Sequence, residues 1–227
     1  TMTLEEKMAA HRAWRQGRYE QLTDAVYKRR GWTPNGVPTL ERLKELGYAT
    51  ACVGKWHLGD QREFLPTRQG FDHYFGIPYS NDMQRKSTET GEKVVPLLRD
   101  ERVVELLTDE GQGRIVERYT EEALAFVREN AARPFFLYLP HTAVHTPIHP
   151  GAAFAGKSSN GRFGDWVEEV DWSTGRILEV LRERRLEGRT LVIFTSDNGP
   201  WLIKGPDGGS AGPLRGGKGS TWEGGVR

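Results

Sequence analysis

The chain has 227 residues, of which 37% are hydrophobic and 28% charged, a composition that can bury a large core and that excludes a disordered tail. With 32 Lys and Arg against 31 Asp and Glu, the formal net charge of +1 gives no support to a nucleic-acid groove or to binding at an anionic membrane surface. The single cysteine, Cys52, excludes an intrachain disulfide and a cysteine-based metal site. The near-neutral charge therefore favours a small-molecule partner. The sequence shows no signal peptide, no membrane-spanning apolar run and no Asn-x-Ser/Thr acceptor.

The first fifty residues carry two helix signals and one strand signal. Thr3-Leu-Glu-Glu6 has the spacing of a capping box and predicts a helix that continues to about Arg30. The turn-rich stretch 32–38 predicts a loop, and Thr39 predicts the cap of a second, short helix. The apolar residues 48–53 then predict a strand. Helix, tight turn and strand in this order are typical of an α/β protein.

The polar region 84–114 contains two β-rich stretches within KVVPLLRDERVVELL, on either side of Arg99-Asp100-Glu101. This pattern predicts an exposed hairpin that departs from the main sheet.

Two further helix and strand pairs follow the hairpin. Residues 114–131 predict a helix, and residues 135–139 predict a buried strand that Pro140 ends. Apolar residues at helical spacing over 163–186 predict another helix. The apolar run 190–195 predicts a strand that is buried on both faces.

Three of the predicted strands, 48–53, 135–139 and 190–195, each lead into a loop with side chains that a plain connection does not need. In chain order these are Lys55 and His57, His141 and His145, and Asp197 and Asn198. If the intervening helices form parallel crossovers, the three loops leave the same edge of the sheet and can meet in one site.

These side chains suggest two kinds of chemistry. Asp197 and Asn198 offer hard oxygen ligands for calcium or magnesium, although an ordinary Asx-Gly turn would explain the same tripeptide. Lys55 and His57 offer a fixed charge and a proton-transfer group for a tetrahedral anion, although both residue types are common on surfaces. The prolines around the loop histidines make a zinc-binding helix improbable, so a loop histidine that acts as an acid is the preferred interpretation.

The C-terminal stretch is dense in glycine. Such a composition alone is typical of a flexible loop. Lys218 lies between Gly217 and Gly219, where a backbone without side chains can approach an anion closely. The spacing does not match a P-loop.

Five blocks of the sequence resemble those of sulfatases, most closely of the arylsulfatase A type in the alkaline-phosphatase-like superfamily. In family order they are GYATACVGKWHLGD, FLPTRQGFDHYFGIPYSND, PFFLYLPHTAVHTP, TLVIFTSDNGP and LRGGKGSTWEGGVR. The resemblance implies an α/β sandwich, with a large mixed, mainly parallel sheet flanked by helices, that is incomplete in this chain. It assigns 36–227 to the central part of the catalytic domain and leaves 1–35 as a helical segment with a weak match.

The resemblance also implies a role for individual residues. Lys55 and Lys218 would hold the sulfate, and His145 would donate a proton towards the leaving oxygen. His57 would serve the nucleophile, and Ser80 would line the same pocket. Stabilisation of charge on the sulfate oxygens is the electrostatic part of such catalysis.

The family's metal and nucleophile are matched only in part. Asp197 and Asn198 match two ligands of a divalent metal, usually Ca²⁺ with Mg²⁺ possible. The family nucleophile is formylglycine, made from a Cys or Ser in C-x-P-S-R or its serine version, and neither motif occurs here. Cys52 is followed by Val-Gly-Lys, and no Asp-Asp pair supplies the remaining ligands.

We therefore expect a fragment of a sulfuric ester hydrolase that acts on a small-molecule or glycan sulfate ester. The intact enzyme would be periplasmic, secreted or lysosomal by resemblance. One alternative is a catalytically inactive sulfatase-like protein that binds a sulfated ligand or a partner. Another is a phosphate or phosphonate ester hydrolase of the same superfamily.

Overall fold

The computed structural model describes residues 3–30 and 39–226, and its chain divides into two compact units between Tyr48 and Ala49. The predicted loop 32–38 lies outside the described residues. None of the helices in the described ranges is both long and apolar enough to cross a membrane.

The first unit contains the two predicted helices, α1 (Leu4–Arg30) and α2 (Leu40–Glu45). The predicted capping box is present, because the Thr3 amide donates to Glu6 Oε2 at 2.7 Å and the Glu6 amide donates to Thr3 Oγ1 at 3.2 Å. The Thr39 hydroxyl caps α2 by accepting a hydrogen bond from the Arg42 amide at 3.2 Å.

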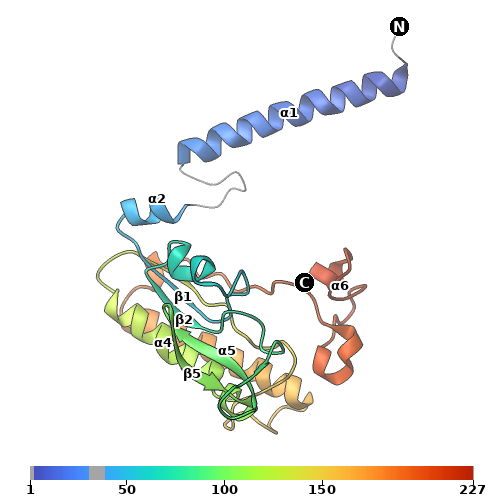
Figure 1. Ribbon diagram of the computed structural model, residues 1–227. Coiled ribbons are helices and arrows are strands. Elements are labelled where there is room, and N and C mark those ends of the chain that lie inside the picture. The colour runs from blue at the N-terminus through green and yellow to red at the C-terminus, as the bar shows by residue number, and fades with distance from the viewer. Residues whose placement is uncertain (1–2, 31–38, 227) are drawn as a thin grey trace. The chain divides into compact units, whose positions relative to one another are not determined.

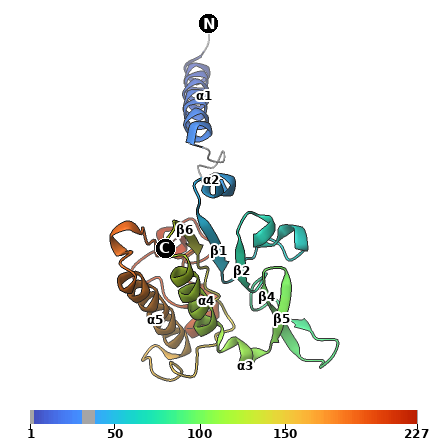
Figure 2. The same ribbon diagram turned by 90° about the vertical axis from the view of Figure 1, so that its left-hand side faces the viewer.

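The second unit is built on a six-stranded sheet in the order β3-β4-β2-β1-β6, with β5 paired to β4. Its strands are β1 (Ala49–Val53), β2 (His73–Gly76), β3 (Arg85–Lys86), β4 (Lys93–Arg99), β5 (Arg102–Leu107) and β6 (Phe135–Tyr138). Strand β1 lies between β2 and β6 and pairs in parallel with both (Figure 2). All five of its residues are buried. Its apolar sequence is therefore that of a central strand covered on both faces.

The hairpin of β4 and β5 extends the main sheet, which corrects the expectation that it departs from the sheet. Strand β4 pairs antiparallel with β2, placing Arg99 opposite Phe75. Its inward side chains Val95 and Leu97 are fully buried in the main core. Val94 and Leu98, which lie between these positions and the strand ends, are also buried, so β4 is covered on both faces. The sheet is mixed, with parallel pairs around β1 and antiparallel pairs at the β4 side.

Two long helices, α4 (Ile115–Glu129) and α5 (Gly161–Glu183), form close to their predicted positions and pack side by side (Figure 1). Helix α4 also packs on β1 and β2. The largest fully buried side chain is Trp166 of α5. The remaining short elements are η1 (Arg62–Phe64), η2 (Pro66–Arg68), α3 (Asp109–Gln112), η3 (Glu187–Arg189), η4 (Leu202–Gly208) and α6 (Glu223–Val226).

The predicted strand over 190–195 does not form, and the prediction of a buried strand there is wrong. The run is irregular, and Leu191, Ile193 and Phe194 are 85%, 76% and 71% exposed. An apolar run becomes a strand only where a neighbouring strand satisfies its backbone groups. Among the described residues, β6 is paired on its β1 side alone, and its Phe136 remains 41% exposed.

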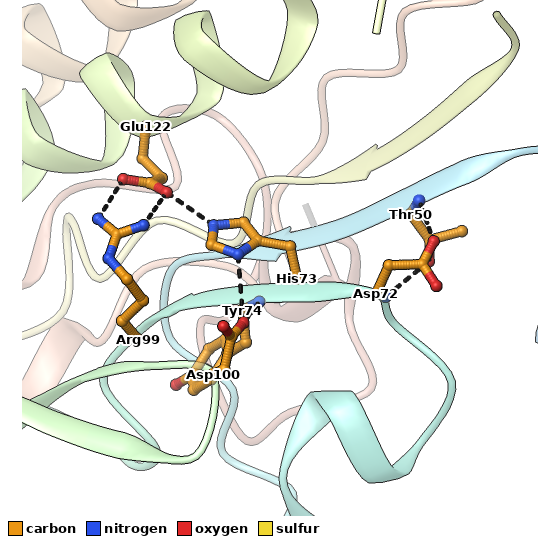
Figure 3. A network of polar contacts seen from close by, with 7 residues as sticks. All are labelled: Thr50, Asp72, His73, Tyr74, Arg99, Asp100 and Glu122. Atoms are coloured by element: carbon orange, nitrogen blue, oxygen red, sulfur yellow. Dashed lines mark hydrogen bonds and ion pairs between the residues drawn. The ribbon is translucent and has the colours of Figure 1, made fainter. Parts of the chain in front are cut away.

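A network of charged side chains ties α4 to the β2 and β4 strands (Figure 3). Glu122 of α4 accepts two hydrogen bonds from the Arg99 guanidinium and lies 2.7 Å from Nε2 of His73. The other ring nitrogen of His73 lies 3.2 Å from Oδ1 of Asp100. The histidine is therefore held between two carboxylates that belong to different elements.

Candidate active site

The loop after β1 is fixed by backbone hydrogen bonds to the loops after β2 and β6. The Gly54 amide donates to the Phe75 carbonyl at 2.8 Å, and the Lys55 amide donates to the Pro140 carbonyl at 2.8 Å. The Trp56 amide donates to the Ile77 carbonyl at 3.0 Å. A Cβ atom on Gly54, whose φ is 139°, would lie 2.0 Å from the Pro140 carbonyl oxygen. Only glycine allows this close approach. The loops after β1 and β6 therefore meet at one edge of the sheet, as predicted.

Lys55 is half-buried among charged side chains from other segments. Burial lowers the pKa of Lys55, and the nearby Lys218 ammonium lowers it further. The carboxylates of Asp197 and Asp82 act in the opposite direction and raise it. The structure thus brings both predicted sulfate-holding lysines and one predicted metal ligand into the same neighbourhood.

His145 lies near enough to Lys55, Asp82 and Lys218 for their charges to affect it. Its Nδ1 is 2.7 Å from the Thr146 carbonyl oxygen and 3.4 Å from the Ser80 hydroxyl. Because the carbonyl can only accept, Nδ1 carries the hydrogen and Nε2 faces outward from this contact. Burial lowers the pKa of His145, and the ammonium groups of Lys55 and Lys218 lower it further. The protonated imidazole is therefore favoured in acidic rather than neutral solution.

Two residues without a role in the sequence interpretation contribute to the surroundings of His145. Asn81 is fully buried, and its Nδ2 donates to the carbonyl oxygens of His145 at 3.4 Å and Pro147 at 3.0 Å. The Trp201 ring lies 5.5 Å from the His145 ring. The sequence could have indicated both residues, because each lies in a family-like block. Asn81 directly follows Ser80, and Trp201 directly follows Asn198-Gly-Pro.

The other two histidines of interest occupy different environments. His57 is exposed and has a φ of 59°, a left-handed conformation that is uncommon outside glycine and often marks a functional site. Within the described residues, no hydrogen bond or ion pair of its ring joins it to His145. His141 is half-buried, with Nε2 3.4 Å from the Ser173 hydroxyl, and desolvation lowers its pKa to about 4. Its ring contacts Tyr119 of α4 and Ser173 of α5, so the candidate loop acid is His145.

Asp197 and Asn198 offer only part of a metal site. Asp197 is exposed, and the backbone carbonyl of Asn198 accepts a hydrogen bond from the Ser196 hydroxyl at 2.7 Å. In the part of the chain that the structure describes, no group of three or more His, Cys, Asp or Glu side chains could hold a metal ion. Two hard oxygen ligands suit Ca²⁺ in kind but fall short of the six to eight it takes.

Cys52 is expected to be unreactive in the folded protein. It is fully buried on β1, and burial raises the pKa of its thiol to about 12, so the thiolate is scarce at neutral pH. With Ellman's reagent, we expect no thiol release from the native chain and one thiol per chain in urea. Native reaction at the rate of the unfolded chain would contradict the burial of this thiol.

Comparisons with known proteins point to one family. The family model described as Sulfatase matches residues 12–227. The N-acetylgalactosamine-6-sulfatase of Sus scrofa is 40% identical over 226 residues, which cover 88% of this chain and 42% of that protein. Arylsulfatase A of Bos taurus is 38% identical over 87% of this chain and 42% of its own. Among solved structures, the PsFucS1 sulfatase of Pseudoalteromonas sp. matches with a TM-score of 0.75 and 31% identity, covering 84% of this chain and 43% of that one.

Proposed function

Because the chain belongs to the sulfatase family, we propose that it forms the anion-holding part of the active site of a sulfuric ester hydrolase. The observation that supports this proposal is that both lysine ammonium groups lie near enough to His145 to lower its pKa, with Lys218 5.1 Å from the Trp201 ring that neighbours the His145 ring. The chain spans 42% of the length of the curated relatives cited above. The intact active site would therefore include residues that these 227 do not supply.

The proposed roles follow from the charge and position of each side chain. Lys55 and Lys218 bind the sulfate oxygens and stabilise the negative charge that builds on them during transfer. As the bond between sulfur and the leaving oxygen breaks, His145 in its protonated form gives that oxygen a proton from Nε2. Ser80 contacts the His145 ring, and His57 serves the nucleophile. Overall the reaction consumes one water, whose oxygen becomes part of the sulfate released, and the products are an alcohol and hydrogen sulfate.

A metal and a nucleophile would complete this site. Asp197 and Asn198 would contribute two oxygen ligands to a divalent ion, preferably Ca²⁺ with Mg²⁺ as the second choice. When bound, the ion would add positive charge beside the sulfate. The precursor of formylglycine is absent from the sequence, and the buried Cys52 cannot replace it. This observation favours a second candidate function, a catalytically inactive sulfatase-like protein that binds a sulfated ligand.

We expect the purified chain to bind sulfate without hydrolysing a sulfate ester. In calorimetric titration, Lys55→Ala should weaken sulfate binding about tenfold, because a hydrogen bond to a charged group contributes about 1.5 kcal/mol. Lys157→Ala is the matched control, since Lys157 is an exposed lysine on the loop before α5. In parallel, the parent chain should release nitrophenol from 4-nitrophenyl sulfate no faster than Lys55→Ala does, with or without Ca²⁺.

Two results would contradict these expectations. Turnover that Lys55→Ala abolishes would show that the site is complete without formylglycine. Sulfate binding that is absent, or equal in both lysine variants and the parent chain, would overturn the assignment of the anion site. Inorganic phosphate and a phosphate monoester, titrated in the same way, test the superfamily alternative, which predicts tighter binding than that of the sulfates.

A further inference from the structure

Two lysine side chains share one indole ring beside the candidate sulfate pocket. The ammonium nitrogen of Lys204 lies 4.5 Å from the centre of the Trp201 ring, and that of Lys218 lies 5.1 Å from it. Both distances are within the range of a cation–π contact. Trp201 therefore holds two positive charges, of which the proposed function uses only Lys218.

The backbone around this ring is tightly fixed. The Trp201 amide donates to the Gly208 carbonyl at 2.9 Å, and the Lys204 amide donates to the Trp201 carbonyl at 2.9 Å. The Lys218 amide donates to the Pro200 carbonyl at 2.8 Å. A Cβ atom on Gly208 would lie 2.0 Å from the Trp201 carbonyl oxygen, so this close turn depends on glycine. The two lysines approach the ring from segments that are hydrogen-bonded to each other.

Among the described residues, neither ammonium group forms an ion pair with an acidic side chain. Across residues 3–30 and 39–226, no ion pair joins Lys204 or Lys218 to a carboxylate. Asp207 follows Lys204 by three residues and is exposed, but it forms no such pair with it. Like charges held near one ring repel each other, and a bound anion relieves this repulsion. The two ammonium groups at this ring therefore suit more negative charge than the single charge that a sulfate ester carries.

The position of Trp201 indicates which part of a substrate Lys204 would meet. The ring centres of Trp201 and His145 are 5.5 Å apart. His145 is the proposed proton donor to the leaving oxygen, so the alcohol portion of the ester lies on the His145 side of the sulfate. A substituent on that portion comes within reach of the exposed Lys204 side chain, whose four-carbon stem is long and flexible.

We propose that Lys204, held against Trp201, binds a second acidic group of the substrate, a carboxylate or a further sulfate on the alcohol that leaves. This proposal rests on the proposed function. It describes the substrate as a sulfate ester with at least two negative groups, and it assigns the preference for the second group to one lysine. Trp201 acts as a positioning residue for that lysine.

The test compares ligands with one and two acidic groups. The probes are N-acetylgalactosamine 6-sulfate, the 4,6-disulfate of the same sugar, and a disaccharide of the 6-sulfate with a uronic acid, together with its carboxyl-reduced form. Each is titrated into the parent chain, Lys204→Gln and the control Lys157→Gln at low ionic strength, where charges are weakly screened. Tighter binding of the disulfate would identify a second sulfate as the preferred acidic group. Tighter binding of the disaccharide than of its carboxyl-reduced form would identify a carboxylate.

We expect the parent chain to bind at least one doubly charged probe about fivefold more tightly than its singly charged counterpart, as for a favourable exposed ion pair. Lys204→Gln should remove this preference and leave the affinity for the monosulfate within about twofold. Trp201→Phe should keep the preference, because it keeps an aromatic face, whereas Trp201→Leu should lose it. Lys157→Gln should change neither affinity.

The outcomes separate this proposal from the one it rests on. If the parent chain binds the monosulfate but Lys204→Gln retains the full preference, or if no preference exists, the second acidic site is refuted and the sulfate site stands. If the parent chain binds none of the probes, both proposals are refuted. Equal binding by Trp201→Phe and Trp201→Leu would refute the positioning role of the indole.

Discussion

Gly76→Ala is expected to lower the free energy of unfolding by about 3 kcal/mol and to abolish sulfate binding. A Cβ atom at this position would lie 1.7 Å from the carbonyl oxygen of Gly54. The obstacle is backbone, so β1 and β2 must separate where the loop of Lys55 begins. Urea denaturation measures the loss of stability, and calorimetric titration with sulfate measures the effect on the site.

The control for this substitution is Gly175→Ala. Gly175 lies inside α5, is exposed, and a Cβ atom there would meet no side chain or other segment within 4 Å. Alanine is a better helix former than glycine, so stability should rise by about 0.5 to 1 kcal/mol with sulfate binding unchanged. If Gly76→Ala were as stable as the parent chain, the close approach of β1 and β2 described above would be wrong.

Glu122→Gln is expected to lower stability by about 2 kcal/mol near pH 5.5 and to flatten its dependence on pH. Burial alone would raise the pKa of Glu122, but hydrogen bonds from His73 and Arg99 hold it at about 2. Its contribution is therefore present above about pH 4.5 and is lost as the pH falls towards 2. The hydrogen bond to Glu122 raises the pKa of His73, although burial opposes it.

The contribution of His73 has the opposite dependence on pH. It is complete below about pH 6.5, the ordinary pKa of histidine, and is lost as the pH rises through the raised pKa. The network should therefore stabilise the fold most between about pH 4.5 and 6.5. Urea midpoints at pH 3, 5.5 and 8 measure this, with Glu179→Gln as control for an exposed pair with Arg176. If the urea midpoint of Glu122→Gln depended on pH in the same way as that of the parent chain, the proposed linkage would be contradicted.

The sequence predicted those elements whose signal is local. The capping box at Thr3 and the cap at Thr39 depend on residues a few positions away, and both form as predicted. The run 190–195 failed because strand formation depends on a neighbour, which the apolar pattern of the run itself does not specify. The sequence predicted the two strands of the hairpin but not the pairing of β4 with β2. That pairing joins Phe75 to Arg99 and Gly76 to Leu98, which are far apart in the sequence.

The same distinction applies to the site. The family-like blocks placed Lys55, His145 and Lys218 in one region, and the structure brings them together. The contact of Lys204 with Trp201 was not predicted, because it depends on the path of a glycine-rich segment that has no periodic pattern. The charged network around His73 was also missed, since its members come from two strands, a turn and a helix that are far apart in the sequence.

The exposed run from Leu191 to Phe194 affects how the protein behaves in concentrated solution. Four consecutive β-prone side chains without a charge or a proline have the composition through which identical chains stack into cross-β aggregates. Arg189 and Asp197 flank the run and act as gatekeepers, because bringing copies into register would also bring like charges together. Salt screens that repulsion. The colloidal stability of the protein therefore decreases as ionic strength increases.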